Sequence, residues 1–378
     1  MNIPTWPVAG EREAELLRMV LESPQWGGFH PFVAEFEQSF AAYQHAAHGI
    51  SAFNGTVTLE LALEVLGIGA GDEVIVPAIS FISTATAVSR AGAIPVFVDI
   101  EHDSFNLDPQ RVREALSPKT RAVMAVHFGG TMCNIAEISR ICREHNLFLI
   151  EDAAHAQGSE WGGKRAGSFG VAGSFSFQNG KVLCSGEGGI LVSSDAGFAE
   201  CARSIANCGR VQGVSFYDHH RLGTNFRLTG FQAAVLLAQF ERLPAQIQRR
   251  TSRARLLKHL LEDVAEIVWQ AQAPEISQNS FYLLIGHVRG PSGARDAFLR
   301  QLTAAGVPCT PFYPHALYAN PAYRHAACRV TPCPVSEQSI GDAFWLPHRV
   351  LLAEEETIRE IAGILRAAVA AELISTRC

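Results

Sequence analysis

The chain has 378 residues, of which 48% are hydrophobic and 18% are charged, and its formal net charge is −6. This balance excludes an intrinsically disordered chain and provides enough apolar residues for one large core or two smaller ones. The mild negative charge, without any dense basic block, argues against a nucleic-acid-binding protein.

The first residues and the cysteines favour a cytoplasmic protein. The chain begins without the basic and apolar regions of a signal peptide, and no apolar stretch is long enough to span a membrane. Its nine cysteines include no CxxC pair, so we expect reduced thiols and no zinc or other metal. We therefore expect a cytoplasmic protein with neither a nucleic acid nor a membrane as partner.

Short apolar runs alternate with helical patterns between residue 50 and about 195. One helix is predicted over 58–67, where Leu59, Leu63 and Leu66 share a face and Gly67 ends the helix. The apolar runs are continuous, which is typical of strands buried on both faces of a parallel sheet. An α/β fold with a mostly parallel sheet is therefore predicted. Its strands are expected at 73–77, 95–100, 121–128, 147–152, 173–177 and 189–194.

The pattern changes near residue 246, where a long basic-faced helix is predicted over 245–264. A smaller α+β arrangement follows, with a proline-rich loop before its last helix. We predict a large domain over 1–245 and a small domain over 246–378. In the small domain, strands are expected at 280–288 and 307–312, and helices at 294–306 and 354–373.

A single lysine, Lys181, stands between two predicted buried strands in the stretch SFSFQNGKVLCSGEGG. A buried amine is costly unless it has a partner or a chemical task. Upstream, Asn54-Gly55-Thr56 forms a turn before a helix, where backbone N–H groups bind anions well. Taken alone, this turn is better explained as a plain helix cap, so it does not define a site by itself.

The strand predicted at 147–152 ends with Glu151 and Asp152, and His155 follows three residues later. Ligands bind at the carboxyl ends of the strands in open parallel sheets. A carboxylate at the end of a buried strand needs a cationic partner. This partner is either a structural cation or a ligand, and the strand alone does not decide between them.

Taken together, these residues indicate a site for pyridoxal phosphate (PLP). PLP requires a lysine for a Schiff base, a carboxylate for the pyridinium nitrogen, an apolar or aromatic face, and N–H and hydroxyl donors for the phosphate. We expect the pKa of the lysine to be lowered, so that it reacts near neutral pH. The sequence offers this set in chain order as Gly55-Thr56, Phe81, Asp152, Ser176 and Lys181.

Five stretches of the chain resemble the DegT/DnrJ/EryC1/StrS family of sugar aminotransferases, which are fold-type-I PLP enzymes. They include IEDAAHAQGS at 150–159, GSFSFQNGKVLCSGEGGILVS at 173–193 and GTNFRLTGFQAAVLLAQFERL at 223–243; the others are 54–88 and 95–109. The resemblance implies a large domain like that of aspartate aminotransferase and a small C-terminal domain. It also implies a homodimer with two shared active sites.

The same resemblance implies a role for each matching residue. Lys181 would carry the Schiff base, and Asp152 would pair with the pyridinium nitrogen. The other implied contacts are His155 near the phenolic oxygen, Phe81 on the ring, Gly55, Thr56 and Ser176 at the phosphate, and Asn225 at the phosphate of the neighbouring subunit's site.

The form SFQNGK…GEGG resembles the branch that includes glutamine-dependent scyllo-inosose aminotransferases and aminohydroxybenzoate synthases. That branch implies L-glutamine or L-glutamate as donor and an unattached keto-cyclitol or keto-sugar as acceptor, while a nucleotide-linked keto-sugar stays open. Two further alternatives are a PLP-dependent dehydratase and a non-catalytic PLP-binding regulator. Lys181 argues against the first, because the related sugar dehydratases carry a histidine in its place, and the complete Lys181–Asp152 set argues against the second. From position, the candidate acceptor contacts are His155, Glu187, Arg227, Tyr313, His315 and His348.

Overall fold

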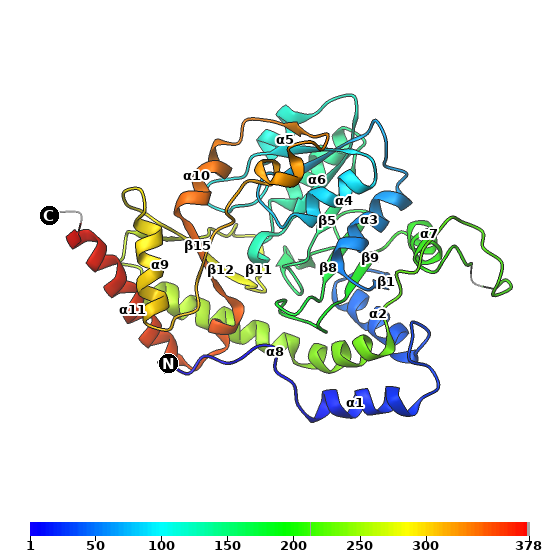
Figure 1. Ribbon diagram of the computed structural model, residues 1–378, viewed down its shortest axis with the longest axis horizontal. Helices are drawn as coiled ribbons and strands as arrows, with labels where there is room; N and C mark the ends of the chain where they lie inside the picture. Colours follow the sequence, from blue (N-terminus) through cyan, green and yellow to red (C-terminus); the bar gives the residue numbers. More distant parts are fainter. Residues whose placement is uncertain (212, 376–378) are drawn as a thin grey trace.

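The computed structural model describes residues 1–211 and 213–375, and an eight-stranded sheet lies at its centre (Figure 1). All neighbouring strands run parallel except for one strand, β9, which is antiparallel to both of its neighbours. The α/β fold with a mostly parallel sheet is confirmed. In order across the sheet, the strands are β1 (His48–Ala52), β9 (Gly189–Ser193), β8 (Ala172–Ser176), β5 (Phe148–Asp152), β4 (Thr120–Val126), β2 (Glu73–Pro77), β3 (Ile94–Val98) and β14 (Arg329–Val330).

Burial on both faces explains why the strands are continuous apolar runs. In β2, Val74 and Val76 pack into one hydrophobic core, and Ile75 packs into the core on the opposite face. Helices α3 (Gly55–Val65), α4 (Ser83–Arg90) and α7 (Ala196–Ala206) cover the first core. The second is covered by α2 (Pro31–Tyr43), α5 (Pro109–Ala115), α6 (Ile135–Glu144) and the first half of α8 (Gly230–Leu260), against which α1 (Glu11–Glu22) packs.

A four-stranded antiparallel sheet forms the core of the smaller part of the chain. Leu284, Phe298 and Ile361 pack together on it with no exposed surface or almost none. Its strands are β10 (Ile267–Trp269), β12 (Leu283–Val288), β15 (Ala343–Pro347) and β13 (Thr310–Pro311), and its helices are α9 (Ala294–Ala304), α10 (Pro334–Asp342) and α11 (Glu355–Ser375). The short elements are a small sheet of β6 (Glu160–Trp161), β7 (Lys164–Arg165) and β11 (Ile276–Gln278), and 3₁₀ turns at Phe128–Gly130, Leu317–Ala319, Pro321–Tyr323 and His348–Leu352.

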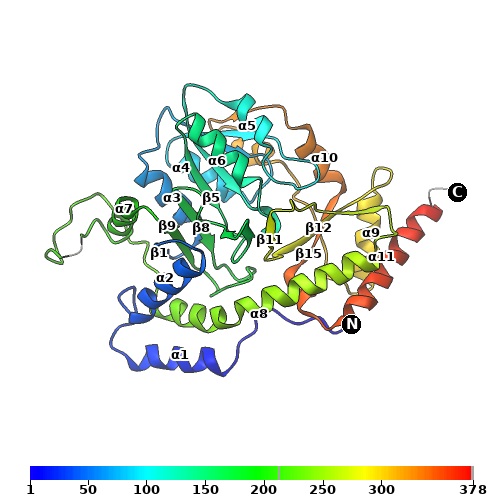
Figure 2. The ribbon, with the colours of Figure 1, turned by 180° about the vertical axis from the view of Figure 1, so that it is seen from behind.

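Helix α8 crosses the boundary that the sequence predicted at 245/246. Its N-cap is Thr229, whose side chain accepts a hydrogen bond from the Gln232 backbone, and the helix continues through Pro244. Figures 1 and 2 show α8 running beneath the large sheet and into the smaller part. In addition, β14 lies within the predicted small domain but pairs with β3 of the large sheet. The two-domain division stays a prediction, because these two elements join the parts.

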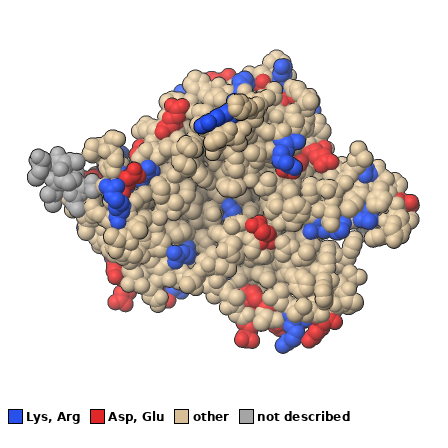
Figure 3. Space-filling model, viewed as in Figure 1, with Lys and Arg blue, Asp and Glu red and all other residues tan. Residues whose placement is uncertain are grey.

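Charged side chains are mixed on one face of the protein (Figure 3). Lysine and arginine side chains on the face in Figure 3 are scattered among acidic ones and gather in no single patch. Within residues 1–211 and 213–375, no helix combines the length and apolar character needed to cross a lipid bilayer.

Candidate active site

A cavity of about 500 Å³ lies where several strands of the large sheet end. Asp152 is the last residue of β5, Ser176 is the last of β8, and α3 begins at Gly55 on the cavity wall. Strand ends of a parallel sheet form such hollows because connections leave the sheet in different directions there. Nine of the predicted site residues line this cavity: Gly55, Thr56, Phe81, Asp152, His155, Ser176, Lys181, Glu187 and Tyr313.

Lys181 lies in a turn after β8, and its side chain is only 9% exposed. Its backbone N–H donates to the Gln178 carbonyl at 2.8 Å, which orients the residue toward the cavity. Burial lowers the pKa of Lys181 to about 8, and the nearby Asp152 carboxylate opposes this shift. A substantial fraction of the amine is therefore neutral, and hence nucleophilic, near physiological pH.

Asp152 is a buried carboxylate without an ion-pair partner among the described residues. One oxygen, Oδ2, accepts a hydrogen bond from Thr84 Oγ1 at 2.7 Å, and the other, Oδ1, accepts from the Ala154 N–H at 3.3 Å. Burial raises its pKa, and those two hydrogen bonds and Lys181 oppose the rise. A protonated ring nitrogen would supply the missing cation, so Asp152 fits the pyridinium partner of PLP.

Another part of the cavity wall offers backbone N–H groups and hydroxyls as a cradle. Asn54 caps α3 by accepting a hydrogen bond from the Val57 N–H at 3.0 Å, which leaves the first N–H groups of the helix free to bind a ligand. A Cβ atom on Gly55 would lie 2.7 Å from Ser176 Cβ, so only glycine permits this close approach of α3 to β8. Thr56 Oγ1 lies 2.8 Å from Ser83 Oγ. This donor set fits the PLP phosphate.

His155 lines the cavity and has one ring nitrogen in a defined hydrogen bond. Its Nδ1 accepts a hydrogen bond from the Gly129 N–H at 3.3 Å, so the ring proton of the neutral side chain lies on Nε2. Burial keeps the pKa of His155 well below its usual range, so the ring is neutral at neutral pH. Phe81, at the cavity wall, is 57% exposed within a single chain. The cavity lining therefore contains a neutral histidine and an accessible aromatic ring in addition to Lys181.

Four predicted residues lie outside this cavity. His348 is buried behind the lysine turn, where its Nε2 donates to the Gly180 carbonyl at 3.2 Å. His315 is exposed, and so is Asn225, which pairs with Asn207 in an isolated bridge. Within one chain, His348 and His315 are therefore not placed to contact a substrate in the cavity, because the lysine turn covers the first and the second faces solvent.

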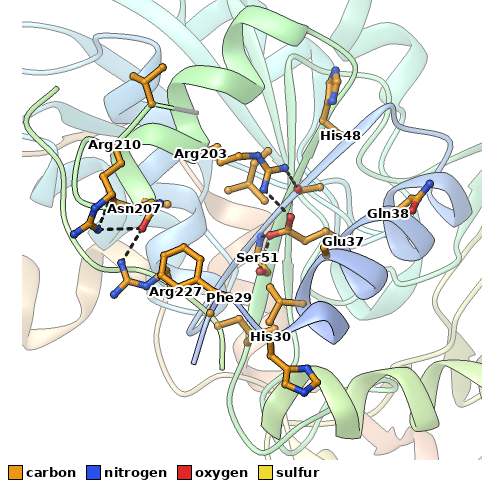
Figure 4. A pocket seen from close by; sticks show the side chains of 18 of the residues that line it. Phe29, His30, Glu37, Gln38, His48, Ser51, Arg203, Asn207, Arg210 and Arg227 are labelled. Carbon is orange, nitrogen blue, oxygen red and sulfur yellow. Dashed lines mark hydrogen bonds and ion pairs between the residues drawn. The ribbon is translucent and has the colours of Figure 1, made fainter. Parts of the chain in front are cut away.

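The fourth residue, Arg227, lines a larger cavity of about 830 Å³ beside the edge strand β1 (Figure 4). There its Nη1 donates to Asn207 Oδ1 at 2.9 Å, and Arg203 forms an ion pair with Glu37 at 2.7 Å. None of the residues that line it also lines the lysine cavity. Within one chain, the larger cavity is therefore separate from the cavity that contains Lys181.

The sequence prediction did not include several residues that line the lysine cavity. Thr84 holds the Asp152 carboxylate, and Tyr282 lies below the Lys181 amine. Tyr282 is part of the predicted strand SFYLLIGHV, where a tyrosine is usually interpreted as a core residue. Its only local signal is a hydroxyl within an otherwise apolar run, which does not identify a partner 101 positions away.

A buried lysine of lowered pKa, a buried unpaired carboxylate and an anion cradle, all at the strand ends of a large α/β sheet, define a PLP enzyme of fold type I. Residues 7–366 match the model of the DegT/DnrJ/EryC1/StrS aminotransferase family, and the chain belongs to that family. It is a PLP-dependent aminotransferase.

The most similar relatives include two enzymes of bacterial biosynthesis. A 3-amino-5-hydroxybenzoate synthase of Amycolatopsis mediterranei is 38% identical, with 98% of each chain covered. An L-glutamine:2-deoxy-scyllo-inosose aminotransferase of Streptomyces kanamyceticus is 34% identical over 95% of this chain and 92% of that protein. The crystal structure of 3-amino-5-hydroxybenzoic acid synthase matches with a TM-score of 0.93 and 38% identity, covering 98% of this chain and 99% of that one. The predicted resemblance is thereby confirmed.

Proposed function

We propose that this aminotransferase moves an amino group from L-glutamine or L-glutamate to the keto group of a cyclitol or sugar that carries no nucleotide. The cavity lining carries this proposal. Lys181 is the only lysine or arginine among its described residues, while Asp152 and Glu187 are acidic. A nucleoside diphosphate would bring two further phosphates, and within one chain the described lining residues offer them no arginine and no lysine besides Lys181, while the donors at the start of α3 are taken up by the PLP phosphate. Uncharged hydroxyl groups need only the hydrogen-bonding side chains that are present.

Each residue of the site has a task in this reaction. When bound, PLP supplies a reactive aldehyde and a conjugated ring that accepts electrons. Asp152 keeps a proton on the ring nitrogen, and the start of α3 with Ser176 holds the phosphate. When its amine is not bonded to the cofactor, Lys181 carries a proton to and from the substrate carbon. A pKa of about 8 suits an amine with this task.

Recognition of the acceptor is assigned to the mouth of the cavity. Glu187 and Tyr313 line it, and Gln178 adds an amide. Carboxylate, phenol and amide groups hydrogen-bond ring hydroxyls. Glu187 and Gln178 are exposed and Tyr313 is half-buried in the single chain, so an analogue without a hydroxyl is rejected strongly only where the bound acceptor excludes water from these groups.

A panel of half-reactions tests the acceptor. The enzyme is first converted to its aminated cofactor form with L-glutamine or L-glutamate. Keto-cyclitols, free keto-sugars and nucleotide-linked keto-sugars are then added one at a time, and the return of the starting absorbance band is followed. We expect the unattached ring ketones to restore the band fastest. Faster return with the nucleotide-linked ketones would overturn the choice of acceptor and leave the aminotransferase activity intact.

The proposal includes a homodimer in which Asn225 reaches the phosphate of the partner's site. Asn225 is exposed and lies in the connection between α7 and α8, part of which projects from the molecule beyond α7 in Figure 1. Large exposed apolar side chains on one segment are typical of an interface. In this segment they are Val214 (45% exposed), Phe216 (54%), Tyr217 (81%) and Leu222 (95%).

Mixing two inactive variants tests the shared site. One is Lys181→Ala, and the other combines Asn225→Ala with Arg227→Ala. If each site uses residues of both subunits, a heterodimer places all defects in one site and leaves the other intact, so up to about half of the activity returns. Native mass spectrometry confirms that heterodimers have formed. Heterodimers without activity, or a monomer at micromolar concentration, would contradict the shared site.

A further inference from the structure

Tyr282 lies under the reactive lysine, in the residue just before β12. The Lys181 Nζ atom is 4.5 Å from the centroid of the Tyr282 ring, over its face. An ammonium group at this distance is attracted by the negative face of an aromatic ring, and the attraction increases when water is excluded. A neutral amine is not held in this way.

Two histidine rings fix the position of the Tyr282 ring. His155 lies 4.4 Å from it, and His348 is stacked at 6.1 Å with an angle of 27°. Trp6 in turn packs edge-on against His348 at 4.5 Å. A ring that is packed from several sides keeps its face in one orientation.

The same aromatic cluster holds the backbone of the lysine turn. Trp6 Nε1 donates to the Lys181 carbonyl at 3.1 Å, and His348 Nε2 donates to the Gly180 carbonyl at 3.2 Å. The base of the lysine side chain and the ring below its tip are therefore fixed relative to each other. Because both are fixed, the Lys181 side chain can place its Nζ atom over the Tyr282 ring without any movement of the backbone.

We propose that the face of Tyr282 is the seat of the Lys181 ammonium during the part of the reaction in which the amine is not bonded to the cofactor. The inference rests on the role of Lys181 in the proposed function. Tyr282 is then a positioning residue: it holds the lysine while the amine carries a proton. Once the proton has been given up, the attraction ends and the neutral amine leaves the ring.

The other groups around Lys181 do not replace this seat. Asp152, on β5, is an anion that favours the ammonium form, but it is the partner of the cofactor nitrogen when PLP is bound. Burial keeps the pKa values of His155 and His348 well below the usual range, so both are neutral at neutral pH. Burial also raises the pKa of Tyr282 to about 12 and raises that of Tyr313, which follows β13. Glu187 is the remaining acidic residue of the cavity lining.

The test measures the pKa of Lys181 in the cofactor-free chain. Trace labelling with acetic anhydride across a range of pH, read by peptide mass spectrometry, gives the pKa of each lysine. Loss of the ring removes support for the ammonium, so Tyr282→Leu lowers the pKa of Lys181 by roughly half to one and a half units. Tyr282→Phe keeps an aromatic face and leaves the pKa within a few tenths of a unit, a margin well below that shift.

Two controls accompany these variants. Tyr313→Leu removes a tyrosine from the same cavity but not the ring below Nζ, and it does not lower the pKa of Lys181. Lys258, on α8, also has a pKa of about 8 from burial, and it serves as an internal reference in every sample. Circular dichroism checks folding, and Tyr282→Met replaces the leucine variant if that variant does not fold.

The direction of the shift separates the seat from a merely structural role. If Tyr282 only filled space, its removal would admit water and raise the pKa of Lys181. An unchanged or raised pKa in Tyr282→Leu would overturn the proposal, as would a phenylalanine variant that behaves like the leucine one. Because no amino donor or acceptor is present, a wrong acceptor assignment does not affect this outcome.

Discussion

Replacing Asp152 with asparagine removes one charge from a buried site and changes almost no volume. Asparagine can still accept the hydrogen bond from Thr84 Oγ1, which is 2.7 Å away in the present structure. The contact from the Ala154 N–H, at 3.3 Å, is the weaker one and costs about 1 kcal/mol if it is lost. The hydrogen-bond contribution to the effect is therefore small.

The charge contribution is much larger. Removing one partner of a buried ion pair costs about 3 to 5 kcal/mol. At 1.36 kcal/mol for each factor of ten, this corresponds to a rate lower by roughly 10² to 10⁴. Single-turnover reaction with L-glutamine, followed by the cofactor absorbance, measures the rate in Asp152→Asn while the cofactor stays bound. We expect the cofactor band to form and the turnover to fall within this range.

The adjacent residue offers a matched control. Glu151→Gln makes the same chemical change one residue earlier, also on a buried carboxylate, but Glu151 does not line the cavity. The control variant loses stability and keeps most of its rate per folded molecule. A loss smaller than about tenfold in Asp152→Asn, or about 1.4 kcal/mol, would show that Asp152 is only structural.

Three further predictions concern Lys181 and Glu151. Borohydride reduction attaches the cofactor to Lys181, and Lys181→Ala binds cofactor without this adduct; peptide mass spectrometry that finds the adduct on another lysine contradicts the assignment. Because burial lowers the pKa of Lys181 from 10.5 to about 8, the unfolded chain binds more protons than the folded one between these values, and the stability of the cofactor-free chain rises with pH there. Lys181→Met removes this part of the slope in urea unfolding, and an unchanged slope refutes the burial argument. Glu151→Gln lowers the free energy of unfolding by about 1 to 3 kcal/mol, because the NH₂ group of the glutamine faces backbone N–H groups that now donate to Glu151. A thermal melt within error of the wild type would contradict this.

Local sequence patterns were enough to predict six of the eight strands of the large sheet, but not the two at its edges, β1 and β14. The strand predicted at 73–77 is β2, and the strands around 148–152 and 172–176 differ from prediction by one residue at most. Continuous apolar runs and turn residues act over a few positions, and so they are visible in a single sequence. Asp152 and Lys181 could also be identified from the sequence, because a carboxylate at the end of a buried strand and a lysine between two buried strands are costly without a chemical task.

Contacts between distant segments could not be predicted in this way. Tyr282 reaches Lys181 only because the smaller sheet packs beside the strand ends. His348 was predicted to contact the substrate, but its ring packs against Trp6 from the other end of the chain. The boundary predicted at 245/246 rests on a change in composition along α8, where an apolar half on the large sheet continues into a more basic half. The amphipathic pattern of the sequence alone does not show that the apolar half and the basic half of α8 form one continuous helix.

The last two residues of β5 also have a consequence for assembly of the sheet. Successive side chains of a strand point to opposite faces. Asp152 therefore faces the cavity, and Glu151 faces the other side, where it contacts His127 at 2.9 Å and receives the N–H groups of Gly167, Phe169 and Gly170. If β5 slipped by one residue, the side chain of Asp152 would point to the opposite face of the sheet, away from the cavity. Glu151 would then lose the N–H groups that donate to it. The register of β5 that gives Glu151 its hydrogen bonds is therefore the same register that places Asp152 in the cavity. Glu151 thus selects the correct pairing of this strand during assembly of the sheet.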